Sequence, residues 1–112
     1  MTAMTATPAA EAKGYLWAEL DIADPERFEA EYSVAVRPLL ARYGARFVIL
    51  DDAPVVLEGG RSVRRTLLVE FASRAAARAF YDDPAYQAIV PARQRWSTGH
   101  LYLLDGVPTE QA

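Results

Sequence analysis

A carboxylate and the chain's only histidine are the strongest candidates for acid/base chemistry. Glu19 lies in the alternating segment 15–22, and His100 begins the apolar segment 100–104. If these segments pair as antiparallel strands, Glu19 can lie opposite His100. A carboxylate that orients an imidazole forms a general acid or base near neutral pH. We therefore take Glu19 and His100 as candidate catalytic residues, with a structural cross-strand pair as the alternative.

A second polar cluster is expected next to this pair. If segment 64–71 pairs with the other edge of segment 15–22, Glu70 lies opposite Tyr15, and Arg46 lies near Glu70. Arg46 is suited to binding a substrate carboxylate or enolate, and Tyr15 to donating a hydrogen bond. The alternative is a structural ion pair with a tyrosine cap. The candidate substrate site is completed by Glu70, Trp17, Leu68 and Tyr102, for whose aromatic rings interface packing is the alternative role.

The sequence predicts no metal site and no cofactor. With no cysteine and one histidine, thiolate and histidine-rich metal sites are excluded. Asp82-Asp83 fits a helix cap better than a ligand pair, and Gly59-Gly60 lies between strands, without the spacing of a phosphate-binding loop. A haem would require His100 as its axial ligand, which we do not expect.

Composition and charge limit the classes of binding partner that we expect for this chain. The 112 residues carry 12 Lys+Arg against 15 Asp+Glu, a net charge of -3, which argues against a nucleic-acid binder. We find no secretory signal and no apolar run of about 18 residues, so we expect a cytoplasmic protein without a membrane segment. We expect a disordered tail over residues 1–12, one domain over 13–107 and a C-terminal tail over 108–112.

The elements that must position these residues follow from hydrophobic periodicity and turn signals. Asp24-Pro25 and Asp83-Pro84 are typical of helix starts, Gly44 of a helix end, and Pro38 of a kink. We expect strands at 15–22, 46–50, 64–71 and 100–104, a strand resuming at 55–58 beyond a bulge, and helices over 24–43, 73–81 and 83–95, the last broken at Pro91. Arg93, Arg95 and Trp96 either gate a pocket mouth or form a solvated helix end.

The order β-α-β-β-α-β predicts a ferredoxin-like α+β fold, with an antiparallel sheet and helices on one face. Strands one and three are expected in the middle, with strand four next to strand one. The helix-facing side should collect Leu16, Ala18, Leu20, Phe47, Ile49, Leu67, Val69, Phe71, Leu101 and Leu103. The other side should collect Tyr15, Trp17, Glu19, Val48, Leu50, Thr66, Leu68, Glu70, His100, Tyr102 and Leu104.

This second face is too apolar and aromatic for a monomer's solvent-facing sheet. We expect a second copy of the chain to pack on it, which gives a homodimer with a barrel-like interior. A monomer whose open face is covered by a small-molecule ligand is the alternative.

Several segments resemble one known family, domain-of-unknown-function family 1330, over about residues 13–106. They are Lys13-Gly14-Tyr15, Asp24-Pro25, Tyr43-Gly44-Ala45-Arg46-Phe47, Leu57-Glu58-Gly59, Glu70-Phe71 and, most specifically, Phe80-Tyr81-Asp82-Asp83-Pro84-Ala85-Tyr86-Gln87. The resemblance implies a dimeric α+β barrel but no agreed activity. Related barrels include cofactor-independent monooxygenases, lactone isomerases, cyclases and haem enzymes, an analogy at the level of the fold alone. Ala72, where the family tends to have proline, and Trp96, where a smaller residue is expected, depart from the pattern.

These observations lead to two hypotheses. The first is a cofactor-independent enzyme of isomerase, cyclase or oxygenase type that does acid/base chemistry on a small apolar carbonyl metabolite. Glu19 and His100 then transfer protons, while Arg46 and Tyr15 orient oxygen atoms. The second is a non-catalytic, ligand-binding or structural homodimer. It predicts that Glu19 and Glu70 are fully paired, and a cavity of about 300 Å3 or more would count against it.

Overall fold

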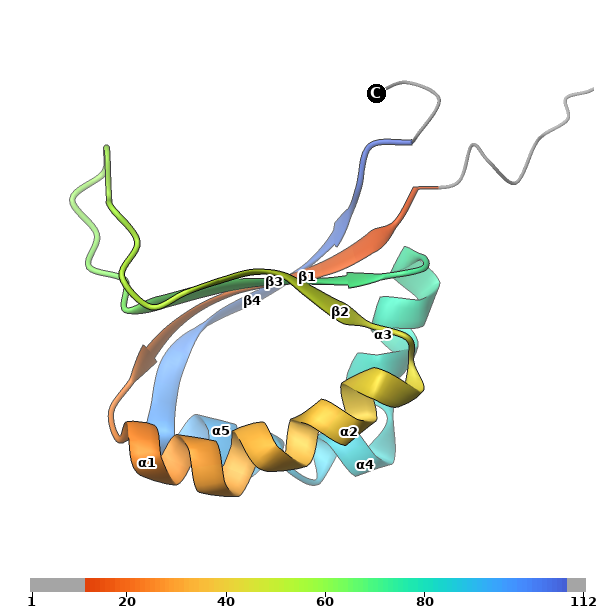
Figure 1. Cartoon of the computed structure of the whole chain (residues 1–112), viewed down its shortest axis with the longest axis horizontal. Coiled ribbons are helices and arrows are strands. Elements are labelled where there is room, and N and C mark those ends of the chain that lie inside the picture. The colour runs from red at the N-terminus through yellow and green to blue at the C-terminus, as the bar shows by residue number, and fades with distance from the viewer. Residues whose placement is uncertain (1–11, 109–112) are drawn as a thin grey trace, which may run out of the picture.

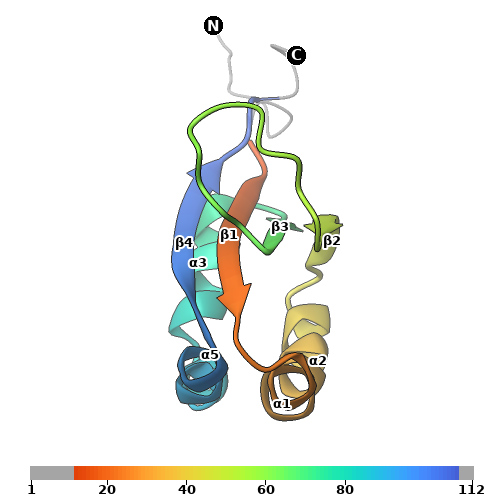
Figure 2. The same ribbon diagram turned by 90° about the vertical axis from the view of Figure 1, so that its left-hand side faces the viewer.

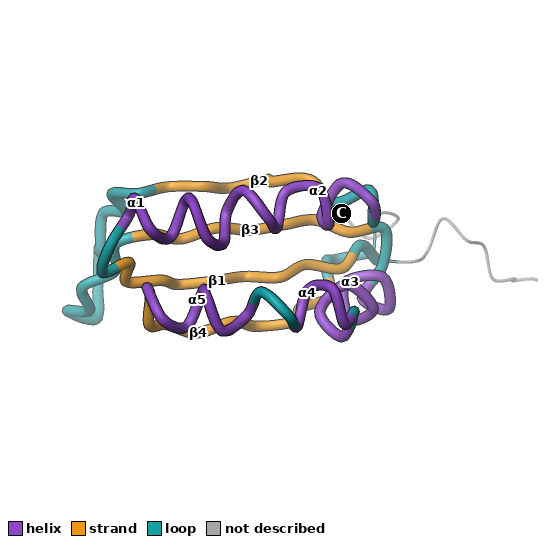
Figure 3. Tube along the Cα trace, turned by 90° about the horizontal axis from the view of Figure 1, so that it is seen from below, coloured by secondary structure: helices purple, strands orange, loops and turns teal. Residues whose placement is uncertain are grey.

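The computed structural model describes residues 12–108, so the expected tails lie outside the described residues apart from Ala12 and Pro108. Two rows of helices lie against one face of a four-stranded sheet, which arches over them (Figures 1 and 3). The elements are β1 (Gly14–Ile22), α1 (Pro25–Phe28), the π-helical turn η2 (Glu29–Ser33), α2 (Val34–Arg42), β2 (Arg46–Asp51), β3 (Arg65–Phe71), α3 (Arg74–Asp82), α4 (Pro84–Gln87), α5 (Val90–Trp96) and β4 (Ser97–Asp105).

The sheet confirms the predicted fold class. Its strand order is β2-β3-β1-β4, and all neighbours are antiparallel. The predicted register is also confirmed, because Glu19 lies opposite His100 and Tyr15 lies opposite Glu70. Viewed from its end, the sheet has helices on one side only (Figure 2).

Local capping explains why the helices begin where they do. The Asp24 side chain accepts a hydrogen bond from the Arg27 backbone N–H at 3.1 Å, and Pro25 occupies the first turn of α1. Asp83 and Pro84 repeat this arrangement at the start of α4. The chain stays helical through Pro38, and α2 ends at Arg42. Gly44, with a φ of 66°, follows the C-cap residue Tyr43 and turns the chain toward β2.

One predicted strand is wrong, because residues 55–58 form no strand. They belong to the connection 52–64, which rises from the sheet on the side away from the helices (Figure 1). Val55 and Leu57 in this connection are 82% and 88% exposed. Without an apolar surface to pack on, this short apolar run gains nothing from strand pairing.

A bulge in β2 corrects the predicted faces of two residues. The register shifts between Phe47 and Ile49, so Ile49 pairs with Leu68 and Leu50 pairs with Leu67. One extra residue in a strand moves every later side chain to the opposite face. Ile49 therefore lies on the open face and Leu50 on the helix face, the reverse of the sequence-based expectation.

The core lies between the sheet and the helices. Its largest fully buried side chains are Phe71 and Tyr86. The Phe80 ring lies 4.5 Å from the Tyr86 ring and 5.5 Å from the Phe71 ring, measured between centroids. Over residues 12–108, no helix combines the length and hydropathy needed to cross a membrane.

Candidate functional site

The predicted cluster of Tyr15, Glu70 and Arg46 is formed on the open face of the sheet. The Tyr15 hydroxyl donates a hydrogen bond to the Glu70 carboxylate at 2.8 Å, and Arg46 Nε lies 2.9 Å from the same carboxylate. The tyrosine hydrogen bond, aided by the guanidinium, lowers the pKa of Glu70 below its ordinary value. Glu70 is therefore an ionised, fully partnered carboxylate at neutral pH.

The candidate catalytic pair is adjacent in register but not hydrogen-bonded. Glu19 forms an ion pair with Arg61 and accepts a hydrogen bond from Trp17 Nε1 at 3.4 Å. The exposed His100 ring stacks on Tyr102, with 6.4 Å between centroids. Within the described residues, no hydrogen bond joins Glu19 to His100.

Glu19 and His100 line an open hollow of about 420 Å3 together with Arg61 and Thr98. This hollow lies where the connection 52–64 returns toward the sheet. Its walls are mostly polar, and it is open to solvent. It brings the predicted pair together in one place. Leu68 and Tyr102 do not line it.

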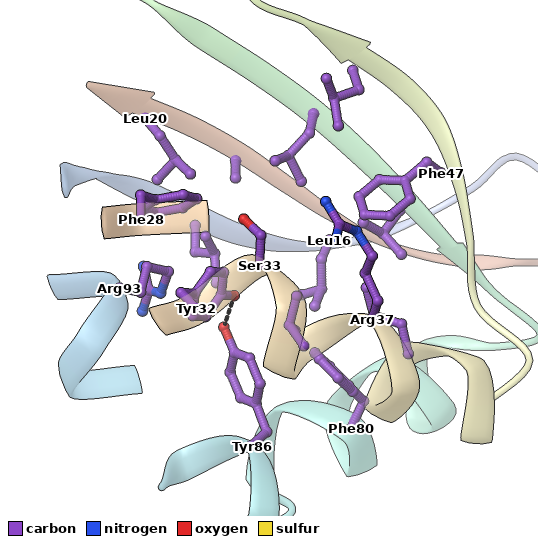
Figure 4. Close-up of a pocket in the computed structure, with 17 residues that line it drawn as sticks. Leu16, Leu20, Phe28, Tyr32, Ser33, Arg37, Phe47, Phe80, Tyr86 and Arg93 are labelled. Atoms are coloured by element: carbon purple, nitrogen blue, oxygen red, sulfur yellow. Dashed lines mark hydrogen bonds between the residues drawn. The ribbon is translucent and has the colours of Figure 1, made fainter. Parts of the chain in front are cut away.

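A second cavity, of about 110 Å3, lies on the other side of the sheet, between the strands and the helices (Figure 4). Its walls are apolar side chains of both layers, among them Leu20 and Leu67 from the sheet and Phe28 and Phe80 from the helices. None of the eight predicted site residues lines it. Sequence reasoning therefore missed this cavity.

Polar groups are concentrated on the helix side of the cavity. The hydroxyl oxygens of Tyr32 and Tyr86 are 2.7 Å apart, and Arg93 and Ser33 line the same wall (Figure 4). Burial raises the pKa of both tyrosines, that of Tyr32 well above its ordinary value. Both phenols therefore stay protonated at neutral pH. One hydroxyl donates its hydrogen bond to the other, and the second keeps an O–H that can donate to a ligand.

Three local features bring these polar groups to the cavity. The π-helical turn η2 adds one residue to a turn, so that the adjacent Tyr32 and Ser33 both line the cavity. The Asp83-Pro84 cap begins α4, which buries Tyr86. α5 then brings Arg93 to the same wall.

The sequence held only weak signals for this site. Tyr32 has the spacing of a core stripe, and Tyr86 belongs to the most specific segment of the family resemblance. Arg93 was expected at a pocket mouth or at a solvated helix end. A serine next to Tyr32 on the buried side of the helix cannot be anticipated from a 3.6-residue period, because the π turn changes that period.

Comparison with known proteins supports the fold. The family model of DUF1330, a domain of unknown function, matches residues 13–107. A crystal structure of a protein of unknown function from Rhodopseudomonas palustris is 20% identical, with a TM-score of 0.71 over 87% of this chain and 84% of that chain. No curated protein matches the chain at a significant level.

Two further structures share the fold at lower similarity. SnoaB, a cofactor-independent oxygenase from Streptomyces nogalater, is 16% identical with a TM-score of 0.57, covering 83% of this chain and 91% of that chain. A dimeric ferredoxin-like protein of unknown function from Thermobifida fusca is also 16% identical, with a TM-score of 0.56 over 85% of this chain and 92% of that chain. At this identity the likeness shows the fold alone.

Removing the Tyr15 hydroxyl tests the Glu70 cluster. Tyr15→Phe should raise the pKa of Glu70 toward its ordinary value, measured by following the Glu70 side-chain carboxyl carbon by NMR. Because the pKa of Glu70 is lower in the folded than in the unfolded protein, its ionised carboxylate stabilises the fold at a pH above the ordinary pKa. This stabilisation is lost as the pH falls through the lowered pKa. We therefore expect Tyr15→Phe to lower the free energy of unfolding by about 1 kcal/mol at pH 7 and by less at acidic pH.

Tyr102→Phe is the matched control, because its hydroxyl has no hydrogen bond within residues 12–108. It should change the free energy of unfolding by less than about 0.5 kcal/mol at either pH. An unchanged Glu70 titration in Tyr15→Phe would contradict the cause assigned to the pKa shift.

Proposed function

The chain belongs to the DUF1330 family, and we propose that it is a small cofactor-independent enzyme that does acid/base chemistry on a small, largely apolar carbonyl compound. The observation that carries the proposal is the apolar cavity between sheet and helices, with hydrogen-bond donors gathered on one wall. Such a combination is typical of small-molecule sites. The fold shared with SnoaB, described as a cofactor-independent oxygenase, supports the class of enzyme.

The volume of the cavity limits the size of the ligand. An engineered apolar cavity of about 150 Å3 is known to bind benzene. The cavity of about 110 Å3 is smaller than that, so a ligand can be no larger than a single ring or a short branched chain. Phe28, Phe80 and the aliphatic residues around them favour an apolar body.

The paired tyrosines supply the acidic part of the proposed chemistry. A ligand carbonyl placed on this wall accepts a hydrogen bond from Tyr32 or Tyr86, which stabilises negative charge that develops on the oxygen. One such donor is typically worth about 10²–10³ in rate. The α-proton of the ligand must then pass to solvent water, because the described residues that line the cavity include no carboxylate and no imidazole. The enolate formed in this way is a shared first intermediate of isomerisation, cyclisation and cofactor-free oxygenation.

The sequence-based assignment of Glu19 and His100 as acid and base stays a prediction for a separate site. Both side chains lie across the sheet from the cavity, so one ligand cannot contact both sites. Arg46, Tyr15, Glu70, Trp17, Leu68 and Tyr102 likewise stay predicted substrate contacts of the open face. The cytoplasmic location expected from the sequence is also a prediction.

We propose that the open face of the sheet is covered by a second copy of the chain. Tyr102 and Leu104 are 45% and 42% exposed on β4, and the bulge adds Ile49 at 40% from β2. Contiguous apolar surface of this kind is typical of an interface. A dimeric ferredoxin-like neighbour supports this arrangement.

A non-catalytic, ligand-binding homodimer is the second candidate function. Two observations favour it: Glu19 and Glu70 are both paired, as that hypothesis predicts. The described residues that line the cavity also include no aspartate, glutamate or histidine that could serve as a base. The cavity of about 110 Å3 lies below the size that would count against it, whereas the open hollow of about 420 Å3 beside Glu19 and His100 exceeds that size.

A charge on the open face should separate the proposed dimer. Analytical ultracentrifugation of the wild-type protein should give a mass twice the 12.4 kDa of one chain. Tyr102→Glu should yield a monomer, because a carboxylate would be buried without a partner in the interface. Val34→Glu is the control, since Val34 is 55% exposed on α2, away from the sheet face. A dimeric Tyr102→Glu variant, or a monomeric wild type, would exclude this interface.

Blocking the cavity should abolish binding of a one-ring ketone. We expect acetophenone to bind the wild-type protein, observed by saturation-transfer NMR. Leu67→Phe adds volume inside the cavity and should weaken binding at least tenfold. Leu68→Phe adds the same volume on the opposite face of β3. Loss of binding in Leu68→Phe alone would place the ligand on the open face and contradict the proposed site.

Hydrogen–deuterium exchange distinguishes catalysis from binding alone. The protein should accelerate exchange of the acetophenone methyl protons in D2O, because enolate formation is the rate-limiting event. Tyr86→Phe removes a donor and should slow this exchange about tenfold or more. Binding without faster exchange would favour the non-catalytic alternative.

The same assay tests the predicted acid/base pair. Glu19→Gln and His100→Ala leave the cavity intact and should not slow exchange if the chemistry occurs between the sheet and the helices. A large loss in both variants would assign the reaction to the open face, as the sequence-based prediction has it.

A further inference from the structure

The Arg93 side chain has a buried donor without a partner. Arg93 Nε is the buried side-chain nitrogen or oxygen that lacks any hydrogen bond over residues 12–108. Its backbone is fixed, because the Ser97 hydroxyl donates a hydrogen bond of 2.6 Å to the Arg93 carbonyl at the end of α5. An unsatisfied buried donor is costly, and in a native protein it calls for an explanation such as a bound water molecule, an ion or a ligand.

No carboxylate of the described residues compensates the charge of Arg93. None lies within ion-pair distance of its guanidinium, although acidic residues occur nearby on the helix surface. Glu31 is engaged by Arg95 at 3.8 Å and by Trp96 Nε1 at 2.8 Å. Glu29 is engaged by Arg37 at 2.9 Å. Within the described residues, the partly buried guanidinium of Arg93 therefore has no carboxylate counterion.

Arg93 lies at the same wall of the cavity as the two tyrosines. It lines the cavity together with Tyr32 and Tyr86, which are joined by their 2.7 Å hydrogen bond (Figure 4). The charge of Arg93 acts to lower the pKa of both tyrosines, although burial outweighs it.

The other walls select against strongly hydrated ligands. Leu16, Leu20, Phe28 and Leu67 offer no polar side-chain group. Arg37, the other arginine at the cavity, is more than half exposed and already paired with Glu29. A phosphate or a dicarboxylate would therefore lack enough partners. A ligand with one anionic group and an apolar body matches both parts of the cavity.

We infer that the natural ligand of this cavity is a small apolar monoanion, a monocarboxylate or a phenolate, whose charged oxygen is bound by Arg93 Nε and a tyrosine hydroxyl. This inference rests on the proposed function, because it names the class of compound that the cavity would accept. The anion satisfies the unpartnered donor, and the ring or chain occupies the apolar space. A guanidinium is well suited to a planar oxyanion.

The experiment compares benzoate with benzamide, which has almost the same shape but no charge. Dissociation constants are measured by calorimetry at pH 7.5, with acetophenone as a neutral reference for the cavity. Wild-type protein should bind benzoate at least tenfold more tightly than benzamide. This comparison needs no variant, so it stands even if a substitution at Arg93 disturbs folding.

Variants then assign the preference to one side chain. Arg93→Met should weaken benzoate binding at least tenfold while acetophenone binding stays within threefold. Arg93→Lys keeps the positive charge and should retain part of the preference for benzoate over benzamide. Arg95→Met is the matched control on the same helix and should behave as wild type, because Arg95 is 63% exposed and lies near Glu31.

The outcomes separate this inference from the proposed function. If acetophenone binds but benzoate is not preferred, or if Arg93→Met keeps the preference, the anion assignment is wrong and the cavity remains a site for neutral carbonyl compounds. If neither benzoate nor acetophenone binds, the proposed function of the cavity fails together with this inference.

Discussion

The packing of helices on only one face of a four-stranded antiparallel sheet determines where both candidate sites can lie. The covered face must be apolar to bury the helices, and the sheet arches over them (Figure 1). Where the two layers do not fully meet, they leave the cavity of about 110 Å3. The uncovered face keeps its polar cluster and its exposed apolar side chains, which is why it is suited to a second copy of the chain.

Much of this architecture follows from local patterns in the sequence. Alternation with a period of two assigns most strand residues to a face, and the Asp-Pro pairs at Asp24 and Asp83 determine two helix starts. Alternation excludes a register shifted by one residue, whereas a shift of two would keep every face, and the structure confirms the register that places Tyr15 opposite Glu70. The bulge before Ile49 could not be predicted, because no glycine or polar residue marks it. The apolar run near Val55 resembles a strand but has no surface to pack on.

The cavity was missed for a different physical reason. Its polar residues come from helices and follow one another through turns whose geometry is set by tertiary packing. Tyr32 and Tyr86 have the spacing of core aromatics, and they do pack in the core. What distinguishes them is that their hydroxyls meet from positions 54 residues apart in the chain, at a cavity wall that Arg93 also lines. On strands, by contrast, the alternation of apolar and polar side chains makes a polar residue on a given face easy to identify. Glu19 and His100 are therefore the candidate catalytic residues that the sequence indicates.

The most direct test is a crystal structure of the protein with acetophenone bound, which shows whether the ligand site lies between the sheet and the helices. Our expectation is that the ring lies within the cavity, near Phe28 and Leu67, with the carbonyl oxygen within hydrogen-bond distance of the Tyr32 or Tyr86 hydroxyl. A ring stacked on Trp17 and Tyr102 of the open face, with nothing bound in the cavity, would contradict it.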